Sequence, residues 1–320
     1  MVPMYLNTFA TSLAPLDMTT TDEFTSLLQS ADDLGIRHSP SVEYRSRQTV
    51  IRGLRFHYLE WGVSDAPPVL LLHGGNQSAH SWDLVSLHLA DRYHLFALDQ
   101  RGHGDSEWTR DQDYSFETRA ADALEFASEL GLSSPVVIGH SMGGYVAMTM
   151  ALADPRLAKG LVLVDVGPEL SQRGVEVIRD FVTHNVEFDS LEQFLDVVAR
   201  YDRFRSREHI ARTLKYNMLC RADGKYASKV DHRRLPGVSA MPKPPTLEDF
   251  KVLTNPVLVV RGEASDVFDP DAAARFVAAL PNGRLVTVPN AGHNVHSANT
   301  PGFLEVVGPF LAELAQVAAT

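Results

Sequence analysis

The chain has 320 residues, of which 29 are Lys or Arg and 40 are Asp or Glu, so its formal net charge is −11. Hydrophobic residues make up 44% and charged residues 22%, which is the composition of a globular protein with a sizeable core and excludes a mostly disordered, collagenous or coiled-coil chain. The acidic balance argues against a general nucleic-acid binder, because phosphate contacts need a basic surface.

Cys220 is the single cysteine, so the chain has no intramolecular disulfide and no C-x-x-C zinc or redox pair. The first residues lack the basic start and continuous apolar run of a signal peptide. There is also no uninterrupted run of 18 apolar residues. We therefore expect a cytoplasmic protein that does not enter a membrane.

Residues 1–42 have mixed periodicity and predict an N-terminal extension with one short helix that ends at Gly35. Two strands are predicted at 42–51 and 54–61, separated by an Arg-Gly turn. Six short apolar runs of the kind found in strands buried on both faces of a parallel sheet follow at 69–73, 94–99, 135–140, 160–165, 256–262 and 284–289.

Helical segments alternate with these runs at 116–130, 142–153 and 269–280 and after residue 300. This alternation predicts an α/β fold with a mostly parallel sheet and helices on both faces.

The alternation is interrupted between residues 165 and 256, where no strand-like run occurs and amphipathic helical spacing appears, including a helix over 205–221. We interpret this part as a helical cap inserted before the last two strands. The predicted organisation is an extension at 1–42, a core formed by 43–168 and 246–320, and a cap at 169–245.

The segment Gly139-His-Ser-Met-Gly143 is the strongest chemical signal in the chain. It fits G-x-S-x-G directly after a predicted strand and directly before an apolar helix. A sharp strand-to-helix turn of this kind needs small flanking residues, and it holds the Ser141 hydroxyl at a helix N-terminus, where developing negative charge is stabilised. Ser141 is therefore the predicted nucleophile.

A serine hydroxyl needs a base, and the base needs an acid. His293 lies on a loop after the last strand-like run, which makes it the predicted base; His296, three residues on, is a weaker candidate. Asp266 and Asp165 each follow a strand-like run, and both fit the chain order Ser, Asp, His. We favour Asp266 as the acid.

The glycines after the run at 69–73 allow backbone N–H groups to approach a substrate oxygen. We predict an oxyanion hole formed by the N–H groups of Gly75 and Met142.

Five motifs occur in one order over about residues 43–318: His73-Gly-Gly75, Asp99–Ser106, Gly139–Gly144, Gly262–Asp266 and Gly292-His293. In this combination the chain resembles the α/β-hydrolase superfamily, in the branch of capped serine esterases, lactonases and C–C hydrolases. The resemblance implies an α/β-hydrolase fold and a Ser-His-Asp catalytic triad. It also makes Asn76, Trp82 and Trp108 candidate pocket residues, and His140 and Asp165 are further candidates for the pocket wall.

The leading functional prediction is hydrolysis of a carboxylic ester or lactone of a small molecule through an acyl-Ser141 intermediate. The alternatives are hydrolysis of a C–C bond in a diketone acid, cofactor-free haloperoxidase-like perhydrolysis, and a hydrolase-fold receptor for a small ligand. We expect no cofactor and no metal, because H-E-x-x-H and a cysteine cluster are both missing from the sequence.

Residues 200–234 of the predicted cap contain eleven basic and four acidic residues. These cations either form a solvated or ion-paired surface, or one or two of the arginines hold a substrate carboxylate, which the planar guanidinium suits. The second interpretation predicts a carboxylate-bearing substrate.

Overall fold

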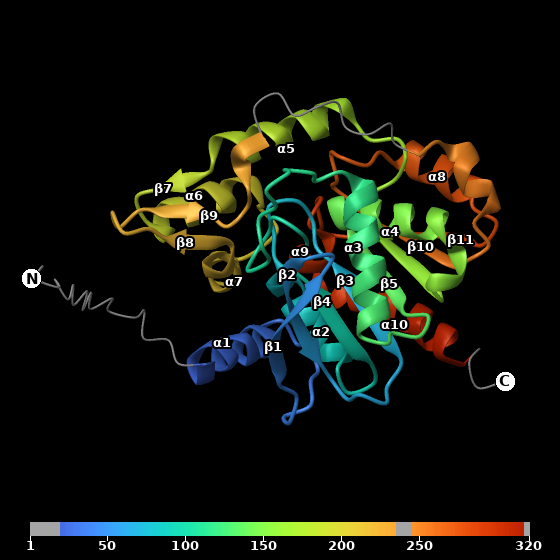
Figure 1. Cartoon of the computed structure of the whole chain (residues 1–320), viewed down its shortest axis with the longest axis horizontal. Helices are drawn as coiled ribbons and strands as arrows, with labels where there is room; N and C mark the ends of the chain where they lie inside the picture. The colour runs from blue at the N-terminus through green and yellow to red at the C-terminus, as the bar shows by residue number, and fades with distance from the viewer. Residues whose placement is uncertain (1–19, 235–244, 317–320) are drawn as a thin grey trace, which may run out of the picture.

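The structure, a computed structural model, describes residues 20–234 and 245–316. Its centre is an eight-stranded sheet (Figure 1). In spatial order its strands are β1 (Tyr44–Ile51), β2 (Leu54–Trp61), β4 (His94–Leu98), β3 (Pro68–Leu72), β5 (Val136–His140), β6 (Gly160–Val164), β10 (Val257–Gly262) and β11 (Gly283–Val288).

The strands from β4 to β11 run parallel, whereas β2 is antiparallel to both β1 and β4. All residues of β5, β6 and β10 are buried, as expected for strands covered on both faces, whereas the edge strand β11 is only partly buried. The registers pair Leu72 with Gly139, and Gly139 with Leu163. The loops after β3, β5, β6 and β10 therefore leave the sheet at one edge, where a ligand site is expected in this type of fold.

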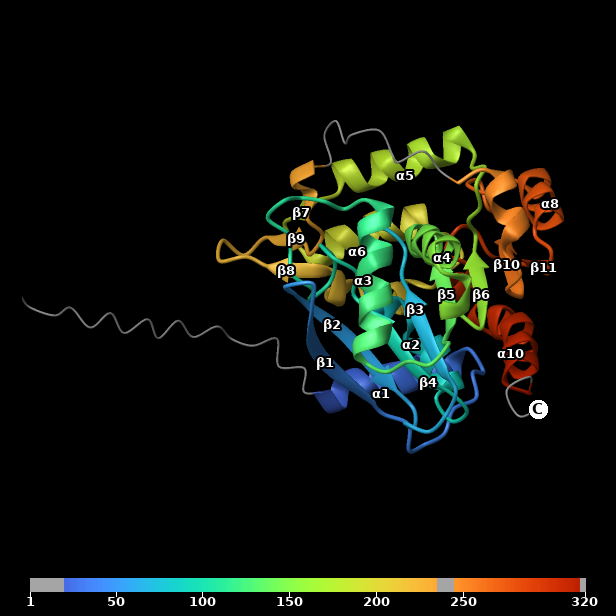
Figure 2. The same ribbon diagram turned by 45° about the vertical axis from the view of Figure 1, so that its right-hand side comes forward.

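Helices cover both faces of the sheet (Figure 2). One apolar cluster packs α1 (Thr20–Asp33), α2 (Asp83–Leu89), α9 (Val295–Ala298) and α10 (Thr300–Gln316) against one face. A second cluster packs α3 (Phe116–Glu129), α4 (Met142–Ala153) and α8 (Pro270–Ala279) against the other. The α/β architecture with helices on both faces is thus confirmed.

The helix predicted in the N-terminal extension is α1, and the chain turns after it at Gly35, whose φ is +66°. Leu27 and Ala31 are buried in the core, so this helix packs on the body. Glu23 accepts a hydrogen bond from Tyr216 at 3.2 Å and pairs with Lys215 at 3.0 Å. The extension therefore also contacts the inserted region.

That inserted region lies between β6 and β10, above the upper end of the sheet in Figure 1. It contains α5 (Gln172–His184), α6 (Leu191–Tyr201) and α7 (Arg207–Leu214), with an apolar cluster of its own. It also holds a small antiparallel sheet in the order β7 (Glu187–Phe188), β9 (Tyr226–Ser228) and β8 (Met218–Cys220). Residues 235–244 of the predicted cap lie outside the described residues.

The predicted insertion with helices before the last two strands is confirmed, but it also contains a small sheet, and the expectation of a helix over 205–221 was wrong. Helix α7 ends at Leu214, and Met218–Cys220 pair with β9 instead. Asp223-Gly224 forms the connecting turn: Gly224 has φ +83°, and the Arg221 N–H donates to the Lys225 carbonyl at 2.7 Å. An Asp-Gly pair is a strong hairpin signal, but its flanking strands are too short to be recognised from alternation.

Within residues 20–234 and 245–316, none of the helices is both long and apolar enough to cross a membrane.

Candidate active site

Ser141 occupies the turn between β5 and α4 with φ 49° and ψ −114°, a backbone conformation that L-residues rarely adopt. The two motif glycines make this turn sterically feasible. A Cβ atom on Gly139 would lie 2.4 Å from the Gly143 carbonyl oxygen, and a Cβ on Gly143 would lie 2.2 Å from the Leu72 carbonyl oxygen. Neither position has room for a side chain, so the strained serine depends on both glycines.

His293 lies on the loop between β11 and α9, with its side chain 9% exposed. Its Nε2 is 3.0 Å from Ser141 Oγ, and its Nδ1 is 2.8 Å from Asp165 Oδ2. Asp165 follows β6 and is completely buried. The Gly262 N–H and the Ser265 hydroxyl also donate to its carboxylate. The sequence-predicted serine and histidine are therefore brought together in a continuous hydrogen-bonded line with a carboxylate.

The carboxylate in this line belongs to Asp165, contrary to the preference for Asp266. The Asp266 side chain is exposed, whereas its neighbour Ser265 points inward and donates to Asp165. The reason is the strand order: β6 lies directly beside β5, whereas β10, which precedes Asp266, is one strand farther from Ser141. The end of β10 and the loop after it donate hydrogen bonds to the Asp165 carboxylate and do not themselves place a carboxylate next to His293.

The candidate oxyanion donors lie on the loop after β3 and at the start of α4. Gly75 is exposed, and an added Cβ would meet no atom within 4 Å, so a substrate can approach its backbone closely. Met142 is the first residue of α4, where helical geometry leaves the N–H without an intrahelical acceptor. Asn76, next to Gly75, accepts a hydrogen bond from Ser228 of β9 at 3.4 Å, so its side chain contacts the cap.

His140 is buried behind the candidate triad, and burial holds its pKa well below the usual value, so the ring is neutral. Its Nε2 donates to the His293 carbonyl oxygen at 2.9 Å. Gln77 accepts from the Gly74 N–H and donates to Asn294 Oδ1, each at 3.0 Å. These contacts join the loop after β3 to the His293 loop. Motif reading missed Gln77, because no local pattern marks it.

The position of Trp82 differs from the expectation that it lines the pocket. Its indole is completely buried and stacks on the imidazole of His296, with ring centroids 4.1 Å apart. Phe303 packs nearby, at 6.3 Å from the same indole. Trp82 is therefore a core residue, and His296 is a buried neighbour of the site rather than a second base beside Ser141.

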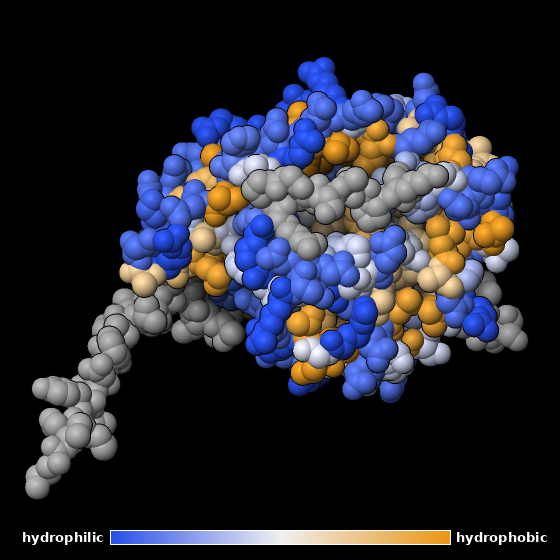
Figure 3. All heavy atoms as spheres, turned by 45° about the horizontal axis from the view of Figure 1, so that its top comes forward, coloured by the Kyte–Doolittle hydropathy of each residue, from blue (hydrophilic) through white to orange (hydrophobic). Residues whose placement is uncertain are grey.

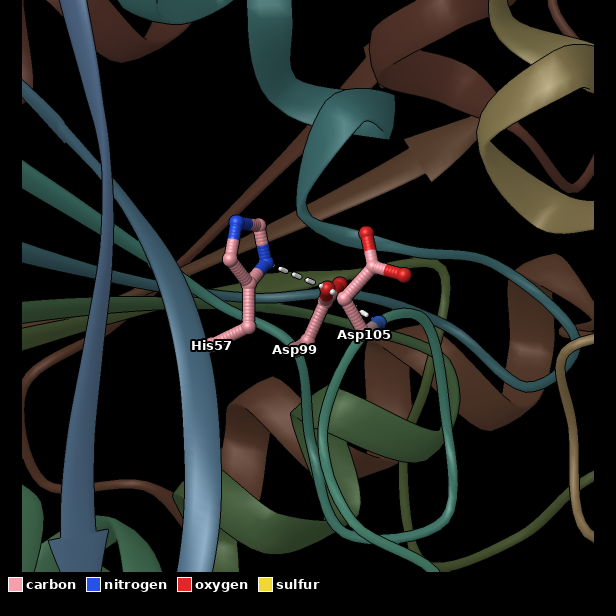
Figure 4. Close-up of side chains that lie close together, drawn as sticks. All are labelled: His57, Asp99 and Asp105. Atoms are coloured by element: carbon pink, nitrogen blue, oxygen red, sulfur yellow. Dashed lines mark hydrogen bonds and ion pairs between the residues drawn. The ribbon is translucent and has the colours of Figure 1, made fainter. Parts of the chain in front are cut away.

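His57, Asp99 and Asp105 form the one group among the described residues whose ligand atoms lie close enough for a metal ion, all within 4.8 Å (Figure 4). Their polar atoms already have protein partners. His57 Nδ1 is 2.7 Å from Asp99 Oδ2, which also accepts from the Asp105 N–H at 2.9 Å. Asp99 Oδ1 accepts from the Ala79 N–H, and Asp105 Oδ1 pairs with Lys229. We interpret the group as a structural network that holds the loop after β4.

Replacing Asp99 by Ala is expected to lower the free energy of unfolding by on the order of 3 kcal/mol or more, because several buried donors lose their acceptor. Burial raises the pKa of Asp99, but hydrogen bonds from His57 and the Asp105 N–H outweigh it and lower this pKa to about 2. The carboxylate therefore stabilises the fold above an unfolded pKa of about 3.9, and this contribution is lost as the pH falls toward 2.

Urea unfolding of the wild type and of Asp99→Ala at pH 7 and at pH 3, between the unfolded and folded pKa values of Asp99, measures the effect, with the exposed Asp105→Ala as control. The difference in free energy of unfolding between the wild type and Asp99→Ala should be smaller at the lower pH. It should not change when EDTA is added. A wild type that loses stability in EDTA would instead indicate a bound metal.

A sequence profile for the alpha/beta hydrolase fold matches residues 67–300. The chain belongs to this family. Ser141, Asp165 and His293 all lie within the matched segment of this hydrolase-family member.

This alpha/beta hydrolase is 31% identical over 299 residues to the esterase Rv0045c of Mycobacterium tuberculosis, in an alignment that covers 91% of this chain and 96% of that protein. A structure of that esterase superposes with a TM-score of 0.75 and covers 92% of this chain. The non-heme chloroperoxidase of Burkholderia pyrrocinia is 30% identical over 257 residues, covering 76% of this chain and 90% of that protein. E-2-(acetamidomethylene)succinate hydrolase shares the fold, with a TM-score of 0.78 at 22% identity.

Proposed function

We propose that the protein is a serine hydrolase that cleaves a carboxylic ester or lactone of a small molecule through an acyl-Ser141 intermediate. The observation that carries this proposal is the hydrogen-bonded line from Asp165 through His293 to Ser141, with distances of 2.8 and 3.0 Å. A hydroxyl next to an imidazole that is itself oriented by a buried carboxylate is the arrangement required for nucleophilic acyl transfer.

In the proposed reaction Ser141 Oγ attacks the carbonyl carbon while His293 Nε2 takes its proton. Asp165 keeps the other ring proton on Nδ1 and stabilises the imidazolium that forms. The negative oxygen accepts hydrogen bonds from the N–H groups of Gly75 and Met142 at the positive end of α4. His293 then gives its proton to the leaving alcohol. A water molecule, deprotonated by His293, attacks the acyl carbon and releases the acid and free Ser141.

The cap cations support a neutral substrate rather than a carboxylate-bearing one. The face seen in Figure 3 is largely hydrophilic, with apolar side chains in separate patches. Eight of the described cap cations have acidic partners: Arg205 with Asp202, Arg207 with Glu192 and Asp196, Arg212 with Asp83, Lys215 with Glu23, Arg221 with Glu187 and Asp223, Lys225 with Glu187 and Asp189, Lys229 with Asp105, and Arg233 with Asp231.

A substrate panel tests the proposal: a short-chain p-nitrophenyl ester, a lactone, a diketone acid, and a half-ester paired with its neutral diester. We expect many turnovers per enzyme on the ester or lactone, and a half-ester kcat/KM no higher than that of the diester. Ser141→Ala serves as the blank for spontaneous hydrolysis.

Turnover of the diketone acid alone would replace the proposal by C–C hydrolysis, and turnover only with peroxide would indicate perhydrolysis. A single slow event per protein would favour a ligand receptor. A half-ester preference of tenfold or more, about 1.4 kcal/mol, would restore the carboxylate hypothesis.

A further inference from the structure

A small polar cavity of about 30 Å³ lies between the cap and the core, next to the candidate site; Gln77 and His296 line it, but Ser141, Asp165 and His293 do not. The cap contributes Arg205, His209, Arg212 and Asn217 to its wall, and the core contributes Ser81 and His296. A volume of this size holds a group as large as one or two water molecules. It is too small for an organic substrate.

Several buried polar atoms of this wall have no hydrogen-bond partner among residues 20–234 and 245–316. They are Nε of Arg205, Nε of Arg212, Oγ of Ser81, Oδ1 of Asn217 and both ring nitrogens of His296. An unpaired buried polar group costs roughly 1–3 kcal/mol, and more when it is charged. Such a concentration of unpaired atoms around one cavity means that bound water or a small polar ligand in the cavity supplies the missing contacts.

The two guanidinium groups are held in place by their other nitrogens. Arg212 Nη1 donates to Asp83 Oδ2 at 2.9 Å, and the arginine side chain is 5% exposed. Arg205 Nη2 donates to Thr213 Oγ1 at 2.8 Å, and the arginine side chain is 10% exposed. Neither guanidinium depends on the cavity for its position, and each has its Nε–H left unpaired.

The excess of hydrogen-bond donors at the cavity wall favours an anion over a cation, although Asp202 and Asp83 offset the charges of Arg205 and Arg212. Burial and the neighbouring Arg205 and Arg212 lower the pKa of His209 to about 2. Burial and Arg205 lower the pKa of His296 to about 3. Both rings are therefore neutral near pH 7, and His296 has one N–H to donate. Two guanidinium N–H groups, this imidazole and the Ser81 hydroxyl give the wall more donors than acceptors.

We propose that this cavity binds a single small monovalent anion of the halide class, held by the Nε–H groups of Arg205 and Arg212, the Ser81 hydroxyl and the His296 N–H. The site is independent of the proposed ester hydrolysis. Because the two arginines come from the cap and the other two residues from the core, the bound anion links the two parts and stabilises their contact.

The test measures the melting temperature at constant ionic strength while sodium gluconate is replaced by sodium chloride or bromide. Gluconate is too large for the cavity, so we expect a saturating rise of about 3 °C as halide reaches about 100 mM. Ser81→Ala should shift the half-saturating halide concentration upward by at least threefold. Ser86→Ala is the matched control: its hydroxyl is also buried and unpaired, but it lies on α2 outside the cavity wall.

A crystal grown in bromide gives an independent reading, with an anomalous peak expected in the cavity. A linear salt effect of equal size in the wild type and both variants would overturn the proposal. A cavity that holds only water in the bromide crystal would overturn it as well.

Discussion

Replacing Ser141 by Ala is expected to lower kcat for a short-chain ester by on the order of 10³ or more, with little change in fold. The expectation follows from the proposed role of the hydroxyl, whose oxygen is 3.0 Å from His293 Nε2 and is the atom that would form the acyl bond. Alanine also avoids any new contact in the turn, since it only removes Oγ. Steady-state kinetics with burst analysis measures the loss.

His293→Ala should lose activity to a similar extent, and the double variant should be no worse than either single one, because members of such a unit do not act additively. Ser86→Ala, which removes a buried hydroxyl outside the site, is the control for nonspecific damage. Turnover by Ser141→Ala within tenfold of the wild type would exclude the acyl-serine mechanism.

Asp165→Asn is expected to cost up to roughly 10⁴-fold in kcat, whereas Asp266→Asn should retain activity within tenfold of the wild type. Asp165 is completely buried and accepts from His293 Nδ1 at 2.8 Å, so it holds the ring proton on the side away from Ser141. An asparagine amide can donate to Nδ1 and so favour the wrong tautomer. Asp266 is exposed, and its loss removes no acceptor from the histidine.

The two substitutions are matched in chemistry, so the comparison isolates position. Melting temperatures of both variants check that Asp165→Asn still folds, since Gly262 and Ser265 also donate to this side chain. The predicted effect of Asp165→Asn falls on kcat rather than on KM. If Asp266→Asn lost activity while Asp165→Asn remained active, Asp266 rather than Asp165 would be assigned as the acid.

Local patterns in the chain were sufficient for most of the fold. Buried parallel strands need continuous apolar runs, and helix ends need caps and glycines, so each element carries its own signal along the sequence. The strand at 54–61 and the helix at 142–153 have the same bounds in the structure. The cap hairpin was missed because strands of three residues are too short to show alternation.

The strained turn at Ser141 could be predicted because it depends on immediate neighbours: it needs glycine two residues before and two residues after the serine. His293 could be predicted from its place after the last strand. The choice between Asp165 and Asp266 had no such local signal, since each follows an apolar run. Asp165 rather than Asp266 contacts His293, because β6 is the strand that lies beside β5 in the sheet. Trp82 likewise lies in the core, and Arg205 and Arg212 line the cavity. Both outcomes depend on contacts between segments that are distant in the sequence, because burial and side-chain pairing are properties of the packed chain.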